Sequence, residues 1–184
     1  MSIHEFRDKL ISTMRSTPIP DKIRTEKDFE TQFVIPVVLQ ASAYEADIRV
    51  YSHPWNDRTH CQPNCHTDNG QIVTGCPRCW AESKKWGSVL AFGTHHTFDL
   101  VARDDSGKTL AVELKFLSAK GGRMPNGEIQ RLMGQCSIAK TKHDCVVGVC
   151  GCQGSFDPRW NRDTDAVRNW FEGAGVHLVF RTVR

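Results

Sequence analysis

The sequence predicts a single α/β domain over residues 1–184. Patterns typical of helices and strands alternate along most of the chain, and a polar segment at 54–96 interrupts them. Charged residues make up 24% of the chain and hydrophobic residues 39%, as in globular proteins that bury a sizeable core. We therefore expect one domain that carries residues 54–96 as an insertion.

Two helices are predicted before the first strand. Residues 3–14 place apolar side chains on one helix face, and the prolines of STPIPD end that helix. Thr25 suits the N-cap of a second helix beginning EKDFETQF, which Pro36 is expected to kink or shorten. Later segments alternate in type. Strands are expected at 48–53, 96–104, 108–117, 145–150 and 177–181, and helices at 127–142 and 163–172.

Charge and hydropathy narrow the class of protein. A net charge of +3 permits a nucleic-acid partner without demanding one. We find no apolar run of membrane-spanning length, and acids and polar residues stand where a signal peptide needs an apolar block. We expect a cytoplasmic protein without a membrane partner. Its eight cysteines are then more readily thiols or metal ligands than disulfides.

The turn DDSGK, residues 104–108, sets the register of a hairpin. If the turn centres on Ser106, opposing residue numbers sum to 212, so Phe98 faces Leu114, Leu100 faces Val112 and Ala102 faces Leu110. All three pairs are apolar and would share one face, because strand side chains alternate.

The same register places two acids opposite each other. Asp99 pairs with Glu113, and Lys115 lies one step along on the same face. Paired Cβ atoms are about 4.5–5.5 Å apart, so the carboxylates repel unless one holds a proton or a cation lies between them. Mg²⁺ favours carboxylate oxygens, and a lysine can orient water or stabilise negative charge. A metal-dependent hydrolysis site is one interpretation, and a solvated sheet face is the other.

FDL (98–100) followed by ELK (113–115), in an α-β-β-β-α-β order, resembles the PD-(D/E)xK nuclease superfamily. Many restriction enzymes and Holliday-junction resolvases have this fold. The resemblance covers most of residues 25–150 outside the insertion. It implies a restriction-endonuclease-like mixed central sheet flanked by helices.

The resemblance also implies roles for individual residues. Asp99 and Glu113 would bind Mg²⁺ or Mn²⁺ with the Leu114 carbonyl, and Lys115 would assist the attacking water in hydrolysing DNA. Phe98 stands where the family often has proline.

Two further positions correspond to features of some family members. A glutamate on the first core helix would reach the metal, with Glu30 the better candidate and Glu26 the alternative. A glutamine on the helix after ELK would approach the site, either Gln130 or Gln135. Gln135 is preferred, because it lies on the side of the helix that could approach the hairpin. A solvated helix face remains the alternative for both.

The cysteine-rich segment carries a second motif. Cys61-x3-Cys65 and Cys76-x2-Cys79 form two pairs separated by ten residues, a spacing that suits a structural tetrahedral Zn²⁺ in a small zinc knuckle or ribbon. His60 or His66 could replace a cysteine. An iron–sulfur cluster could use the same ligands.

Three more cysteines allow a weaker interpretation. Cys145, Cys150 and Cys152 could form a second metal site with His143, but buried packing in a strand is favoured.

Basic and aromatic residues in two segments suit contacts with DNA. The candidates are Arg78, Lys84, Lys85, Trp86, Lys120 and Arg123. A small tryptophan core surrounded by solvated lysines would explain the first segment equally well.

The sequence thus predicts a Mg²⁺-dependent endodeoxyribonuclease with a structural zinc module. A catalytically inactive nucleic-acid-binding protein and a zinc-stabilised interaction module are the alternatives. Double-strand cleavage would suit a two-fold homodimer.

Overall fold

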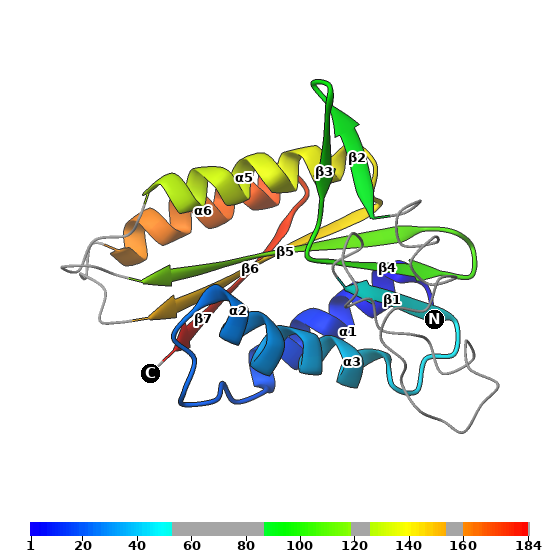
Figure 1. The fold of residues 1–184 in the computed structure, drawn as a ribbon, viewed down its shortest axis with the longest axis horizontal. Coiled ribbons are helices and arrows are strands. Elements are labelled where there is room, and N and C mark those ends of the chain that lie inside the picture. Colours follow the sequence, from blue (N-terminus) through cyan, green and yellow to red (C-terminus); the bar gives the residue numbers. More distant parts are fainter. Residues whose placement is uncertain (53–86, 119–125, 154–159, 184) are drawn as a thin grey trace.

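The computed structural model of the protein describes residues 1–52, 87–118, 126–153 and 160–183 (Figure 1). The helical elements are α1 (Ile3–Ser16), α2 (Glu26–Phe29), the π-helical segment η1 (Glu30–Val34), α3 (Ile35–Ser42), α5 (Asn126–Lys140) and α6 (Trp160–Gly173). The strands are β1 (Ile48–Ser52), β2 (Ser88–Ala91), β3 (Thr94–Thr97), β4 (Leu100–Asp104), β5 (Thr109–Ser118), β6 (Cys145–Gln153) and β7 (His177–Val183).

The main sheet is mixed. Its five strands lie in the order β1-β4-β5-β6-β7, antiparallel from β1 to β5 and parallel from β5 to β7. The two parallel connections place α5 and α6 on one face, while α1, α2 and α3 cover the other (Figure 1). The protein is therefore a layered α/β domain, as predicted. Within the described residues, no helix is both long and apolar enough to cross a membrane.

The two faces of the sheet belong to two apolar cores. Leu100, Val112 and Leu114 pack into the core shared with α1 and α3. Val101 and Ala111 pack into the core beneath α5 and α6. On β4 and β5 the even-numbered residues thus face α1 and α3, and the odd-numbered residues face α5 and α6. Glu113 and Lys115 therefore lie on the α5 side of the sheet.

The predicted hairpin register is confirmed. Leu100 pairs with Val112 and Ala102 pairs with Leu110, and the turn uses Gly107 at a φ of +89°. The predicted position of Phe98 is wrong, because its side chain lies in the core beneath α5. The chain bends after β3, so the expected strand 96–104 divides into β3 and β4.

A second, two-stranded sheet is formed by β2 and β3. It takes up residues 88–97, so most of it falls within the segment 54–96 that the sequence pattern marks as an insertion. The alternation of polar and apolar residues in this stretch is too short to predict a hairpin.

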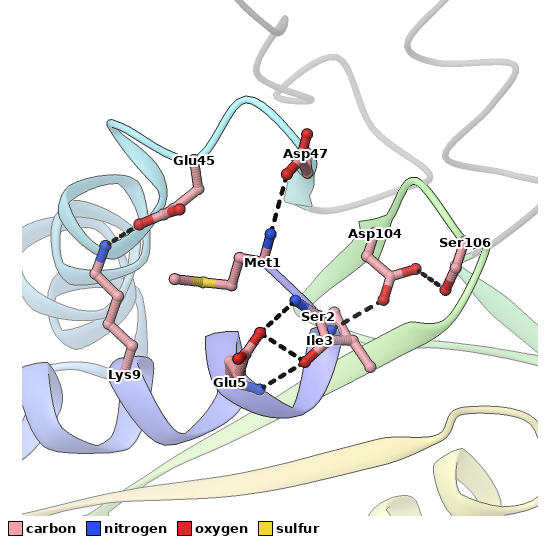
Figure 2. A network of polar contacts seen from close by, with 9 residues as sticks. All are labelled: Met1, Ser2, Ile3, Glu5, Lys9, Glu45, Asp47, Asp104 and Ser106. Atoms are coloured by element: carbon pink, nitrogen blue, oxygen red, sulfur yellow. Dashed lines mark hydrogen bonds and ion pairs between the residues drawn. The ribbon is translucent and has the colours of Figure 1, made fainter.

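Polar contacts fix the start of α1 to the β4–β5 turn (Figure 2). Asp104 accepts hydrogen bonds from the Ile3 amide at 2.9 Å, the Lys108 amide at 3.0 Å and the Ser106 hydroxyl at 2.7 Å. Burial alone would raise the pKa of Asp104, but these bonds outweigh burial and lower it. Asp104 therefore anchors the hairpin that carries the candidate site.

The helical segment after residue 25 begins as predicted. The Thr25 hydroxyl accepts from the Asp28 amide, and the Asp28 carboxylate accepts from the Thr25 amide, forming a capping box. Pro36 does not end the segment. In a regular helix the ring of Pro36 would clash with the carbonyl four residues back, which here belongs to η1. The wider π turn of η1, which ends two residues before Pro36, can accommodate the ring.

Candidate active site

The candidate site lies where β5 continues past the first residue of β4. Leu100 pairs with Val112, and β5 then runs on to Ser118 without β4 beside it (Figure 1). The backbone amides on this edge find acidic side chains instead. The Leu114 amide donates to Asp99 Oδ2 at 2.8 Å, and the Phe116 amide donates to Glu26 Oε2 at 3.1 Å. Two acids are thereby drawn to one edge of the strand.

The Leu114 carbonyl faces the same edge. In a strand the amide and the carbonyl of one residue point to the same side, as the antiparallel ladder requires. Because the Leu114 amide reaches Asp99, its carbonyl also points toward the Asp99 side. This orientation suits the predicted role of that carbonyl as a ligand.

Glu113 is a buried acid, only 1% exposed. Both carboxylate oxygens are buried, and no donor in the described part of the chain reaches either of them. Burial and, after it, the charge of nearby Asp99 raise the pKa of Glu113 to about 10, against the opposing effect of Lys115. Asp99 is close enough to accept a hydrogen bond once Glu113 is protonated. The two carboxyl groups therefore converge, as the register predicts.

Lys115 is buried on the same face as Glu113 and is 7% exposed. Its Nζ atom lies 3.4 Å from Glu26 Oε1. Glu26 is the first residue of α2, so the start of that helix supplies the partner of the lysine. Glu26 therefore holds both the Lys115 side chain and the backbone of Phe116.

Glu26, one of the two predicted helix glutamates, contacts β5 at Lys115 and Phe116. Glu30 is 6% exposed and lies at the first position of η1. Its burial excludes the alternative of a solvated helix face. A π-helical turn such as the one that Glu30 opens is frequent at functional sites.

On α5, Gln135 is half-buried and Gln130 is exposed. The Gln135 Oε1 atom is buried, and the described residues offer it no hydrogen bond. A buried amide oxygen without a donor is costly unless it has a ligand. This supports the choice of Gln135 over Gln130.

Two residues next to Glu113 were not predicted from the sequence, Gly148 on β6 and Cys136 on α5. Gly148 on β6 pairs with Glu113, and a Cβ atom there would lie 3.0 Å from a Leu178 methyl carbon and 3.4 Å from Cys136 Sγ. Burial raises the pKa of the Cys136 thiol, and the charge of Glu113 adds to this effect. The glycine lets α5 pack closely over Glu113. Gly148 could have been identified from the sequence, because a glycine inside a strand often marks a close approach of another element.

The donor set fits a hard divalent cation. Among the described residues no three His, Cys, Asp or Glu side chains form a ready-made metal site. Asp99, Glu113 and the Leu114 carbonyl nevertheless offer oxygen donors of the kind that Mg²⁺ prefers, and Mg²⁺ commonly keeps several waters. The Glu113 oxygens without donors are the observation that favours such a ligand.

The remaining site predictions separate into two groups. Cys150 and Cys152 are buried in the core beneath α5, and Cys145 is buried in the opposite core, as favoured over a second metal site. The other predicted residues lie outside the described residues: Cys61, Cys65, Cys76, Cys79, Arg78, Lys84, Lys85, Trp86, Lys120 and Arg123.

No family model and no curated protein matches this sequence. The chemistry of the site is therefore inferred from its own residues.

Proposed function

We propose that the protein is a Mg²⁺-dependent endonuclease that hydrolyses DNA phosphodiester bonds, with Asp99, Glu113 and Lys115 as its catalytic residues. One observation carries the proposal. Glu113 is buried beside Asp99 with both oxygens lacking a donor, and Lys115 lies on the same strand face. A sheet that only needed stability would not bury a carboxyl group against a second one.

Asp99, Glu113 and the Leu114 carbonyl would hold the Mg²⁺ or Mn²⁺ ion. When bound, such an ion neutralises charge on the scissile phosphate and lowers the pKa of a coordinated water. Asp99 is held for this role by the Leu114 amide, which donates to its Oδ2 atom. Glu113 must lose its proton before it can bind the ion, because its pKa is raised to about 10.

Lys115 would orient the attacking water and stabilise negative charge on the phosphate. Glu26 acts as a positioning residue, since it holds Lys115 Nζ at 3.4 Å and fixes the Phe116 backbone beside it. Burial of Lys115 excludes bulk water from the amine and strengthens its electrostatic effect.

Cleavage assays test the proposal directly. Purified protein is incubated with supercoiled, linear and branched DNA and with RNA, in Mg²⁺, Mn²⁺ or EDTA. We expect divalent-ion-dependent cleavage of DNA. Lys115→Ala should lower the cleavage rate by about 100-fold or more and leave the DNA dissociation constant nearly unchanged.

Lys108→Ala is the matched control, because Lys108 is exposed on the β4–β5 turn. This variant should cleave at the wild-type rate. Cleavage that survives in Lys115→Ala would remove the proposed role of the lysine. Absence of cleavage in every substrate and metal would favour the inactive nucleic-acid-binding alternative.

We also propose a structural Zn²⁺ bound by Cys61, Cys65, Cys76 and Cys79, which the cysteine spacing supports. Metal analysis should find about one zinc per chain, and Cys76→Ser should release it. A zinc-free native protein would contradict this part of the proposal.

The order of elements and the Asp99, Glu113 and Lys115 motif support membership of the PD-(D/E)xK nuclease superfamily. We propose a restriction-endonuclease-like fold, a cytoplasmic location and a two-fold homodimer when both strands are cut.

A further inference from the structure

The β2–β3 hairpin has an unusual residue at its tip. Ala91 and Thr94 form the last pair of the hairpin, so Phe92 and Gly93 are the two turn residues. Both have positive φ, +51° and +74°. Two-residue turns of this kind favour Asn-Gly or Asp-Gly, because a bulky residue is strained at positive φ. Phe92 therefore occupies a position where folding would favour another residue.

The Phe92 ring packs against almost nothing in the described part of the chain. The side chain is 98% exposed, the highest value among the large exposed hydrophobic residues in the described part of the chain. Leu90, on the strand that leads to it, is 64% exposed. An aromatic residue that is both strained and fully exposed points to a contact made outside the folded chain.

The base of the hairpin is fixed to the domain. Val89 is buried in the core beneath α5, and Lys142 Nζ donates a hydrogen bond to the Ser88 carbonyl. The tip extends past α5 and away from the main sheet (Figure 1). The ring is thus held outward on a supported strand pair.

The hairpin leads directly into the candidate active site. Asp99 follows Phe92 by seven residues, a span of at most about 23 Å in extended chain. Stacked bases are spaced about 3.4 Å apart along a strand, so the ring lies within about seven nucleotides of a phosphate held at Asp99. Phe92 can therefore contact the same DNA molecule that the site cleaves.

The size of the apolar patch decides between partners. A stable protein–protein interface buries about 800 Å² on each partner, far more than Leu90 and Phe92 provide. A single aromatic ring matches a nucleobase, since bases of any sequence stack on aromatic side chains. A base that is not already stacked in a duplex is the favoured target, because a ring that inserts into a duplex must first unstack its base pairs.

We propose that Phe92 stacks on an unpaired nucleobase within about seven nucleotides of the scissile phosphate, so that the protein prefers DNA with single-stranded, flap or bulged nucleotides within that distance of the cut. This inference rests on the proposed nuclease function. The hairpin selects the structure of the DNA, and Asp99, Glu113 and Lys115 cleave it.

Binding of fluorescent oligonucleotides in EDTA tests stacking without cleavage. The probes are a perfect duplex, the same duplex with a one-nucleotide bulge, and a single strand. Phe92→Asn removes the ring and places a favoured residue in the turn, so the fold should be kept. We expect its dissociation constants for the bulged and single-stranded probes to rise about 5- to 150-fold, with the duplex value unchanged.

Leu90→Ser is the matched control, since it removes an exposed apolar side chain from the same hairpin. It should leave all three dissociation constants unchanged. Phe92→Trp should retain the preference, and its indole fluorescence should be quenched by the bulged probe. Equal dissociation constants for the wild type and Phe92→Asn would overturn the inference, as would a change in oligomeric state produced by Phe92→Asn.

The two proposals fail separately. If wild-type protein cleaves DNA in Mg²⁺ and Phe92→Asn cleaves bulged and perfect duplexes with wild-type kcat/KM, the stacking inference falls and the nuclease remains. If Phe92→Asn loses the preference for bulged and single-stranded probes, but neither the wild type nor any variant cleaves DNA, the stacking inference stands and the hydrolytic function falls.

Discussion

Replacing Glu113 with glutamine should stabilise the metal-free protein while abolishing cleavage. Glu113 is 1% exposed and has a pKa raised to about 10 from an ordinary value of 4.5. Between these two pH values the unfolded chain has released the proton, whereas the folded protein keeps it. The free energy of unfolding therefore falls as pH rises through this window, by about 1.36 kcal/mol per pH unit.

The size of the effect follows from the pKa. At pH 7.5, three units above 4.5, the cost of keeping Glu113 protonated is about 4 kcal/mol. Glutamine has the same shape and no proton to retain, and its amide can donate to Asp99 as protonated Glu113 would. Glu113→Gln should raise the free energy of unfolding by up to about 4 kcal/mol at pH 7.5 and remove the slope with pH.

Chemical denaturation at several pH values measures this change. Glu128→Gln is the control, because Glu128 lies on α5 in a solvent-exposed pair with Arg131, worth about 0–1 kcal/mol. Mg²⁺ should stabilise the wild type and leave Glu113→Gln unaffected. A Glu113→Gln protein that is no more stable than the wild type, or that still cleaves DNA, would refute the reasoning.

Three further outcomes are expected. Glu26→Gln should lower kcat for DNA cleavage about tenfold, because Lys115 loses its charged partner; unchanged kcat would contradict the positioning role of Glu26. The free energy of unfolding should change by less than about 1 kcal/mol, since Glu26 is half-exposed. Asp104→Ala should lower the free energy of unfolding by about 3 kcal/mol, because the Ile3 and Lys108 amides lose a charged acceptor. The control Asp105→Ala, on the exposed side of the same turn, should change it by less than about 0.5 kcal/mol, and equal effects would contradict the anchoring role of Asp104. Burial lowers the pKa of His143 from 6.5 to about 4, so between these pH values the unfolded chain takes up the proton first and the His143 contribution to the free energy of unfolding falls by roughly 3 kcal/mol on acidification. Glu113 acts in the opposite direction above pH 4.5, so the measurement is the difference between His143→Asn and the wild type in acid denaturation curves, which should grow in favour of His143→Asn from pH 6.5 to 4; a difference that does not change with pH would contradict this.

The hairpin register could be predicted because two independent signals agree. The turn at 104–108 and the apolar pairs on β4 and β5 admit one alignment, since a slip by one residue would move the side chains of one strand to the opposite face of the sheet and break these pairs. That alignment brings Asp99 and Glu113 together. The site could therefore be located from a short stretch of sequence.

The β2–β3 hairpin and the break at Phe98 could not be predicted in the same way. Residues 88–97 show too little alternation to mark two strands, and the residues on either side of the bend at 98–99 are as strand-like as their neighbours. Phe98 packs edge-on against the ring of His143, with the two ring centroids 5.2 Å apart. A contact between residues this distant in sequence leaves no local pattern.

The preference for Glu30 over Glu26 as a metal ligand stays a prediction, but the local helix geometry could not be predicted. A regular helix turns every 3.6 residues, and sequence periodicity assumes that spacing along the whole segment. The π turn at Glu30–Val34 widens the spiral, so the period does not hold through it. The first residue of α2, which precedes the π turn, is the one that contacts Lys115.

A crystal structure of the protein soaked with Mn²⁺ would test the central claim most directly. The ion scatters anomalously and substitutes for Mg²⁺ at oxygen ligands. We predict an anomalous peak between the Asp99 and Glu113 carboxylates and next to the Leu114 carbonyl, absent from Glu113→Gln. Wild-type crystals with no peak there, or with Asp99 and Glu113 joined by a shared proton at saturating Mn²⁺, would contradict the account.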